Sequence, residues 1–233
     1  MKNFSLPVLF YSNLHACDIP IDAFLAKLSD TRREIVQRRP KKDQLASACA
    51  ELLLRRGLTL CGYSDTEPAA IDWNGKPHFV PFSQNLPVVF SITHTAHTVA
   101  VLLSGAENPC GVDAEEIRNL RNMEAIAKKM FTAEELAWFD AQGRTSHAFF
   151  TLWTAKEAFI KYTGEGFSRA LQTVQTAMSI QTDPHTQMRR AQAMDNTVSC
   201  FLRHFEVGSV IFCAALQHAA PLDMYQIPLQ DLQ

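Results

Sequence analysis

The sequence predicts a mixed α/β protein, because its apolar residues follow two different periods in different stretches. Helical spacing runs through residues 21–37, 41–56 and 146–162. Apolar runs rich in β-formers occupy residues 88–93 and 98–103, and a short polar segment separates them as in a hairpin. With 233 residues, of which 47% are hydrophobic, the chain is long enough to bury a substantial core.

Two helices are expected in the first part of the chain. The first covers residues 21–37, where apolar side chains recur at helical spacing. The second covers residues 41–56, because Pro40 can open a helix and Gly57 can close one. We expect these two helices to pack together ahead of the hairpin.

Residues 104–109 are rich in turn formers and mark the expected boundary between two lobes. The N-terminal lobe then comprises residues 1–106, and the C-terminal lobe residues 107–233. Thr132 should begin a helix in the second lobe, because Glu135 three positions later completes a capping box. The other elements expected in that lobe are a strand at 110–115, helices at 123–130 and 146–162, and strands at 197–207, 210–216 and 224–228.

Composition indicates where the protein is located and which classes of partner it lacks. The formal net charge of −2 does not indicate bulk nucleic-acid binding. The six cysteines form no C-x-x-C pair and are interpreted as reduced core residues rather than zinc ligands or disulfides. The apolar stretch in residues 1–11 is too short for a signal peptide, and no apolar run reaches the length of about 20 residues that spans a bilayer. We therefore expect a cytoplasmic protein with no membrane or nucleic-acid partner.

Asp113 and Glu115 form the first candidate for chemistry. On a strand, residues i and i+2 point to the same side, so these two carboxylates would be presented together. Mg²⁺ usually takes one or two carboxylates with waters and phosphate oxygens, and Glu157 could supply a third carboxylate. Taken alone, such a pair is more often the solvated end of a strand.

The helix at 146–162 carries the second candidate. Trp153, Glu157 and Lys161 recur every four residues and therefore share one face. An exposed Glu157–Lys161 ion pair would contribute only about 0.3–0.5 kcal/mol and need have no function. The helix is rich in aromatic residues, however, and Lys156 adds a second cation beside the carboxylate, so a buried site is the alternative.

Several motifs in fixed order resemble one family. G-V-D-A-E at 111–115, F-T-A-E-E at 131–135 and W-T-A-K-E-A-F-I-K-Y-T-G-E-G at 153–166 are similar to motifs of the 4′-phosphopantetheinyl transferase superfamily. The similarity is to its two-lobed, surfactin-synthetase-activating type. Upstream, N-G-K-P at 74–77 and F-S-I-T-H-T at 90–95 also resemble family elements. The basic stretch at 38–39, before a helix ending with L-L-L-R at 52–55, is similar to the family's N-terminal helix, so the match covers about residues 38–166.

The resemblance implies a fold and an activity. The fold would be two similar lobes related by a pseudo-two-fold axis within one chain, so we expect a monomer. The activity would be Mg²⁺-dependent transfer of the 4′-phosphopantetheine arm of coenzyme A to a serine of an apo acyl or peptidyl carrier protein. Adenosine 3′,5′-bisphosphate would be released.

The resemblance also assigns residue roles. Asp113, Glu115 and Glu157 would hold Mg²⁺, and Lys161 would bind the pyrophosphate, which makes Asp113, Glu157 and Lys161 the expected catalytic residues. The serine proton would go either to Glu157 or to a water on the metal. The other residues expected to bind coenzyme A are Lys76, Thr93, His94, Arg39, Ser47 and Lys156, a set that supplies cations and hydroxyls for its phosphates.

Two other functions stay open at this point. A magnesium-dependent nuclease also uses acidic residues and a lysine, but such sites place E-x-K on a strand, whereas here Lys156 precedes Glu157 on a helix. The second alternative is a module that binds coenzyme A or a carrier protein without catalysis. The presence of all three carboxylates and Lys161 favours the enzyme.

Overall fold

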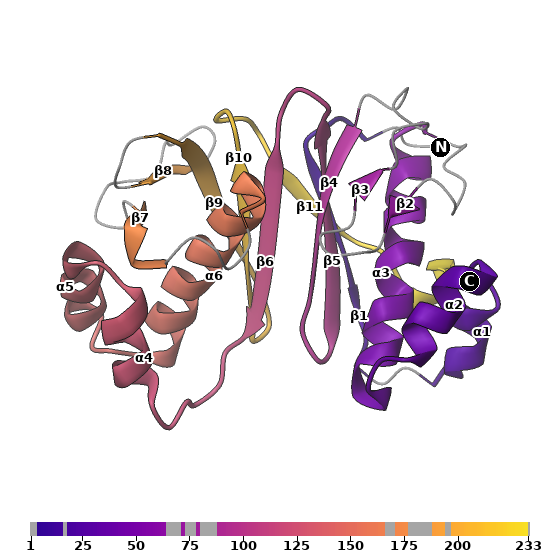
Figure 1. Ribbon diagram of the computed structural model, residues 1–233, viewed down its shortest axis with the longest axis horizontal. Coiled ribbons are helices and arrows are strands. Elements are labelled where there is room, and N and C mark those ends of the chain that lie inside the picture. Colours follow the sequence, from indigo (N-terminus) through magenta and orange to yellow (C-terminus); the bar gives the residue numbers. More distant parts are fainter. Residues whose placement is uncertain are drawn as a thin grey trace. The chain divides into compact units, whose positions relative to one another are not determined.

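The computed structural model describes residues 4–15, 18–63, 71–72, 78–79, 88–165, 171–176, 188–193 and 197–232. Its helices and strands confirm the mixed α/β class (Figure 1). The chain divides into two compact units, Met1–Glu107 with Asp223–Gln233 and Asn108–Leu222. The final segment belongs to the first unit because the last strand pairs with the first. The expected C-terminal lobe of 107–233 therefore differs from the second unit, which ends at Leu222.

A four-stranded sheet with the order β11-β1-β5-β4 forms the first unit. The strands β4 (Val88–His94) and β5 (Thr98–Gly105) pair antiparallel, which confirms the predicted hairpin. The strand β1 (Val8–Asn13), which the sequence analysis did not identify, pairs antiparallel with β5. On its other side β1 pairs parallel with β11 (Asp223–Gln226), near the end of the chain.

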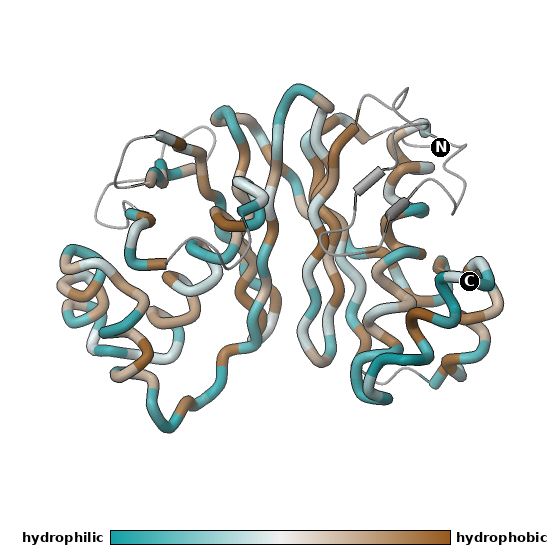
Figure 2. The backbone as a smooth tube through the Cα atoms, viewed as in Figure 1, coloured by the Kyte–Doolittle hydropathy of each residue, from teal (hydrophilic) through white to brown (hydrophobic). Residues whose placement is uncertain are grey.

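The predicted helix at 21–37 is in fact two helices, α1 (Ile21–Leu25) and α2 (Asp30–Gln37). Ser29 causes the break, because its side chain accepts a hydrogen bond from the backbone N–H of Arg32 and so caps α2. Figure 2 shows α2 as largely hydrophilic, in keeping with its exposed position. The short strands β2 (Ile71–Asp72) and β3 (His78–Phe79) pair with each other as a separate sheet.

Helix α3 (Lys41–Leu60) begins after Pro40 as predicted but continues through Gly57, where the sequence analysis expected it to end. A Cβ atom at Gly57 would lie 2.8 Å from Cδ2 of Phe10 on β1. Gly57 is therefore a packing residue that lets the helix approach the sheet closely, rather than a helix stop. The core of the unit lies between them and includes the fully buried Leu53.

A five-stranded antiparallel sheet with the order β6-β10-β9-β8-β7 forms the second unit. Its strands β6 (Cys110–Glu116), β10 (Val210–Leu216) and β9 (Ser199–Val207) were predicted with nearly these bounds. The shorter strands β8 (Arg189–Ala193) and β7 (Val174–Thr176) were not predicted, because segments of that length carry little periodic signal.

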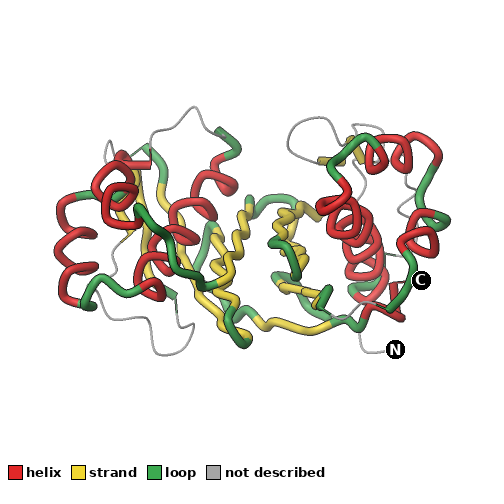
Figure 3. Tube along the Cα trace, turned by 90° about the horizontal axis from the view of Figure 1, so that it is seen from below, coloured by secondary structure: helices red, strands yellow, loops and turns green. Residues whose placement is uncertain are grey.

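Three helices of the second unit match the prediction: α4 (Met123–Met130), α5 (Ala133–Ala141) and α6 (Ser146–Thr163). The expected capping box at Thr132 and Glu135 is confirmed. Figure 3 shows helices in red and strands in yellow, and α6 packs directly on β6 and β10. A 3₁₀ turn, η4 (Leu171–Thr173), leads into β7.

The described cysteines agree with a further expectation. The cysteines that the structure describes are free thiols, and all but Cys61 are buried, whereas Cys17 lies outside the described residues. None of the described helices combines the length and the apolar character needed to cross a bilayer.

A partly buried histidine on β9 should make the stability of the protein sensitive to acid. His204 Nε2 lies 3.0 Å from the carbonyl oxygen of Thr151 on α6, and burial lowers the pKa of His204 to about 4. As the pH falls below about 6.5 the unfolded chain takes up this proton first, so folded stability is lost between pH 6.5 and 4. We expect the free energy of unfolding to fall by about 1–2 kcal/mol from this group between pH 7 and 5.

The measurement is urea unfolding at pH 7 and pH 5 for the wild type, His204→Gln and His218→Gln. His204→Gln should lose less stability than the wild type on acidification. His218 is exposed, so its variant should follow the wild type. Equal losses in all three proteins would contradict the assignment to His204.

Candidate active site

Strand β6 presents Asp113 and Glu115 toward α6. In register with β10, Asp113 lies opposite Cys213 and Glu115 lies opposite Ile211. Directly opposed residues point to the same side of a sheet, and both Cys213 and Ile211 pack into clusters that contain residues of α6. The prediction that the two carboxylates share one side of the strand is therefore confirmed.

Helix α6 brings Glu157 and Lys161 to the same place. Lys161 Nζ lies 2.8 Å from Asp113 Oδ1. Burial and the neighbouring negative charge of Asp113 raise the pKa of Glu157, Lys161 partly offsets this, and Glu115 adds to the rise. The four side chains thus lie close enough to act on one another electrostatically, as the sequence motifs predicted.

Gly111 permits the close approach of β6 and α6. A Cβ atom at Gly111 would collide with the backbone carbonyl oxygen of Ala158 and the backbone nitrogen of Tyr162. Because these are backbone atoms, no side-chain rotation could relieve the collision. The glycine two residues before Asp113 thereby sets the separation between the strand carboxylates and the helix. The sequence analysis treated it only as part of a motif.

Arg118 is a neighbour of this cluster that the sequence analysis missed. Its Nη1 lies 2.7 Å from Glu115 Oε2, and its Cζ lies 4.8 Å from the centroid of the Phe150 ring. The available signal was its position three residues after Glu115. That spacing carries little meaning where a strand gives way to irregular backbone, as it does here.

The donor chemistry of Asp113, Glu115 and Glu157 fits Mg²⁺, which prefers carboxylate oxygens. The carboxylates also act on one another, because Asp113 and Glu115 add to the rise that burial causes in the pKa of Glu157. Within the residues that the structure describes, no three His, Cys, Asp or Glu side chains surround a common point at metal-binding spacing. Asp113 and Glu115 instead make ion pairs with Lys161 and Arg118.

Lys156 was predicted to bind coenzyme A, and the structure contradicts this. Its side chain is fully buried, and its Nζ lies 2.7 Å from Glu135 Oε2. The Nζ also donates to the carbonyl oxygens of Leu171 and Val174 at 2.8 and 2.6 Å. Neighbouring residues on a helix point about 100° apart, so Lys156 enters the core while Glu157 next to it faces β6.

Glu135 completes this buried network from α5. One carboxylate oxygen accepts from the backbone N–H of Thr132, and the other accepts from the backbone N–H and the hydroxyl of Thr176. With Lys156 as its fourth partner, the carboxylate is fully satisfied. The acidic residue of F-T-A-E-E is therefore a structural residue as well as a capping residue.

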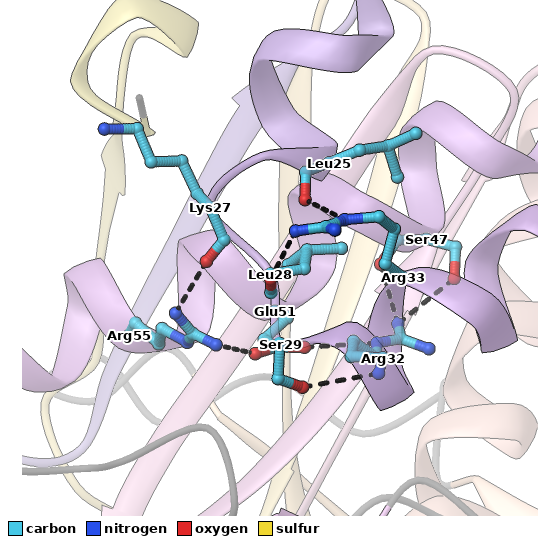
Figure 4. Close-up of polar contacts among 9 residues, drawn as sticks. All are labelled: Leu25, Lys27, Leu28, Ser29, Arg32, Arg33, Ser47, Glu51 and Arg55. Atoms are coloured by element: carbon cyan, nitrogen blue, oxygen red, sulfur yellow. Dashed lines mark hydrogen bonds and ion pairs between the residues drawn. The ribbon is translucent and has the colours of Figure 1, made fainter.

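Ser47 was also predicted to contact coenzyme A, but it lies in the interior of the first unit. Its hydroxyl and its backbone carbonyl both accept hydrogen bonds from Arg32 Nη2, at 3.1 and 2.7 Å (Figure 4). Arg32 in turn pairs with the buried Glu51, which also binds Arg55. Because only 3% of Ser47 is exposed, the structure contradicts a phosphate-binding role for its hydroxyl.

The remaining residues predicted to bind coenzyme A belong to the first unit. Thr93 is buried and His94 is exposed at the end of β4. Arg39 is exposed just after α2, near enough to Arg32 to help burial lower the pKa of that arginine to about 10. Lys76 lies outside the described residues.

Comparison with known proteins points to the same family as the sequence motifs. Residues 109–215, which contain the whole cluster on β6 and α6, match the model of the 4′-phosphopantetheinyl transferase superfamily. The chain is similar to that superfamily over this stretch. The resemblance inferred from the sequence is thereby confirmed.

Individual transferases of the superfamily match different lengths of the chain. The 4′-phosphopantetheinyl transferase AcpT of Salmonella typhi is 38% identical over 92 residues, which cover 39% of this chain and 46% of the relative. The enzyme gsp of Aneurinibacillus migulanus is 33% identical over 129 residues, or 54% and 51% of the two chains. The chain thus spans about half the length of these relatives. The 4′-phosphopantetheinyl transferase of Bacillus subtilis is 25% identical over 201 residues, 83% of this chain and 85% of the relative.

Breaking the buried ion pair of the second unit should lower the stability of the protein strongly. Lys156→Met leaves the Glu135 carboxylate buried without its cation, and we expect a loss of about 3–5 kcal/mol in the free energy of unfolding. Arg144→Met is the matched control, because it removes exposed ion pairs with Glu124 and Asp140 and should change stability by less than about 0.5 kcal/mol. Urea unfolding measures both, and similar losses in the two variants would contradict the structural role.

Gly111→Ala should destabilise the protein more than Gly57→Ala. The new methyl group at Gly57 meets the ring of Phe10, which can shift, whereas at Gly111 it meets the backbone of α6. We expect about 1–3 kcal/mol for Gly57→Ala and a larger loss for Gly111→Ala, measured by urea unfolding. The reverse order would show that β6 and α6 can separate without cost.

Proposed function

We propose that the chain transfers the 4′-phosphopantetheine arm of coenzyme A to a serine of an apo acyl or peptidyl carrier protein. One observation carries the proposal: β6 and α6 bring Asp113, Glu157 and Lys161 together inside the residues that match the superfamily. Each of these side chains suits a step of phosphoryl transfer. The carrier protein and the pathway that it serves are left open.

The reaction replaces a phosphoanhydride bond of coenzyme A by a phosphate ester bond to serine. The serine oxygen attacks the phosphorus on the pantetheine side of the pyrophosphate, a new P–O bond forms, and the bond to the bridging oxygen breaks. Adenosine 3′,5′-bisphosphate leaves with that oxygen, and negative charge builds on it during the step. Lys161, at the margin of the carboxylate cluster, would bind the pyrophosphate and stabilise this charge.

Asp113, Glu115 and Glu157 would hold Mg²⁺, which when bound would neutralise charge on the pyrophosphate. Glu157 would accept the proton of the serine hydroxyl. Its carboxylate comes from α6 to the same place as Asp113 and Lys161, and a carboxylate can serve as the general base of such a step. These residues make the second unit the catalytic one.

In this proposal the first unit contributes the nucleotide contacts. His94 and Arg39 are exposed and can donate to the phosphates of coenzyme A. Thr93 replaces the serine that is usual in the family but keeps a hydroxyl, and Lys76 would add a charge. The two units would be related by a pseudo-two-fold axis, with one chain supplying both. A monomer in gel filtration and a cytoplasmic location are part of the same proposal.

Substitution of Glu157 tests the proposal. Coenzyme A, MgCl₂ and an apo carrier protein are incubated with the enzyme, and the carrier is followed by intact mass for the gain of one phosphopantetheine. Glu157→Gln should lower the rate by at least about 100-fold, because a proton acceptor and an anionic ligand are both lost. Glu124→Gln, which changes an exposed glutamate in the same unit, should transfer at the wild-type rate.

Other outcomes would select another function. No mass gain in any of several apo carriers, with coenzyme A still bound, would indicate a module without catalysis. Cleavage of nucleic acid that is lost in Glu157→Gln would indicate the nuclease. Equal transfer by Glu157→Gln and the wild type would remove Glu157 from the mechanism.

A further inference from the structure

The two carboxylates of β6 are each engaged by a cation from a different part of the second unit. Lys161 on α6 lies 2.8 Å from Asp113, measured from Nζ to Oδ1. Arg118, in the segment after β6, lies 2.7 Å from Glu115, measured from Nη1 to Oε2. The oxygen donors that suit a divalent cation therefore already have two positive charges beside them.

Both cations of these ion pairs keep part of their surface in water, unlike Lys156 in its buried pair. The Lys161 side chain is 28% exposed and that of Arg118 is 51% exposed, whereas the carboxylates of Asp113 and Glu115 are 10% and 25% exposed. Water therefore competes for the cations more than for the carboxylates, so each cation can turn toward solvent. The carboxylate left behind, above all that of Asp113, then needs another positive charge in its place.

Arg118 has other contacts that would keep it near β6 after it leaves Glu115. Its Nη1 also donates to the carbonyl oxygen of Glu116 at 3.0 Å. Its guanidinium group lies over the ring of Phe150, a cation–π contact with α6. Arg118 would thus remain beside the site as a positive charge rather than move away into solvent.

We propose that Lys161 and Arg118 are resident counterions of the carboxylates, and that Mg²⁺ takes their place. When the cation binds, Lys161 leaves Asp113 and Arg118 leaves Glu115, and both become available to the pyrophosphate of coenzyme A. The role of the pyrophosphate rests on the proposed function, whereas the exchange requires only a divalent cation.

The exchange couples two binding events. Mg²⁺ and the anionic substrate both favour the arrangement in which the ion pairs are separated. When one ligand is already bound, the other supplies less of the free energy needed to separate the ion pairs. The two ligands therefore bind cooperatively. By the reciprocity of linkage, coenzyme A raises the affinity for Mg²⁺ by the same factor by which Mg²⁺ raises the affinity for coenzyme A.

Calorimetric titration of the full-length protein with MgCl₂ alone tests the exchange. Arg118→Gln removes one counterion and should lower the Mg²⁺ dissociation constant about two- to five-fold, the equivalent of one partly exposed ion pair. Arg144→Gln is the matched control, since it breaks ion pairs with Glu124 and Asp140 and should leave the constant unchanged. An unchanged or higher constant in Arg118→Gln, or no binding to the wild type, would overturn the proposal.

A second measurement separates exchange from a simple charge effect. The affinity for coenzyme A is measured with and without saturating Mg²⁺ in the wild type and in Lys161→Gln. Because Lys161→Gln has no lysine to release, Mg²⁺ should raise its affinity for coenzyme A less than it raises that of the wild type. The binding of Mg²⁺ by coenzyme A itself is common to both proteins and cancels. An equal rise in coenzyme A affinity in both proteins would mean that Mg²⁺ does not displace Lys161 from Asp113.

These titrations need no carrier protein, so they can fail separately from the proposed function. A protein in which Arg118→Gln tightens Mg²⁺ but no carrier gains mass would keep the exchange and lose the transferase assignment. A protein that transfers phosphopantetheine, but whose Mg²⁺ constant is the same in Arg118→Gln, would keep the assignment and lose the exchange.

Discussion

The buried ion pair between Lys156 and Glu135 is the constraint on which the second unit depends. Lys156 donates to three acceptors and Glu135 accepts four hydrogen bonds, so neither charge is left unsatisfied in the core. The pair joins α6 to the start of α5 and to residues 171–176, three segments that are distant in the sequence. Once Lys156 points into this core, helix geometry leaves the adjacent Glu157 facing β6. The Lys156–Glu135 pair thus fixes the direction of Glu157, although it takes no part in the proposed reaction.

The carboxylates that face the other side of α6, those of Asp113, Glu115 and Glu157, lower the stability of the folded state. Gly111 brings the strand so close to the helix that Asp113 and Glu115 act on Glu157. The pKa of Glu157 is therefore higher in the folded protein than in the unfolded chain. The repulsion of like charges opposes folding, and Lys161 and Arg118, which pair with Asp113 and Glu115, partly offset it. Such an arrangement is typical of a site selected for binding a cation or a phosphate rather than for packing.

Local rules predicted the parts of this site that depend on neighbouring residues alone. Alternation along a strand put Asp113 and Glu115 on one side, and helical spacing put Glu157 and Lys161 on one face. The destination of Lys156 could not be predicted in this way. It is decided by Glu135 and by the carbonyl groups of 171–174, whose approach is a property of the tertiary fold.

The errors in the first unit have the same origin. The hydroxyl of Ser47 was assigned to a phosphate because the family resemblance places such a hydroxyl on this helix, but Arg32 reaches it from another helix. Gly57 has the residue type of a helix stop, and only the ring of Phe10 on a strand far away in the sequence explains why the helix continues. In each case the residue type was informative, but its contact partner comes from a distant part of the chain and could not be predicted from local sequence.

The motif K-E-A-F-I-K on α6 contains two lysines whose surroundings give them opposite roles. Lys156 has lost all contact with water, so any ligand that drew it from Glu135 would leave a buried charge behind, and it can only fix the structure. Lys161 keeps part of its surface in water, so it can leave Asp113 without being buried uncompensated itself, provided that another positive charge takes its place at the carboxylate. The first lysine therefore holds the helix in place, and the second can respond to a cation or an anion at a site that does not move.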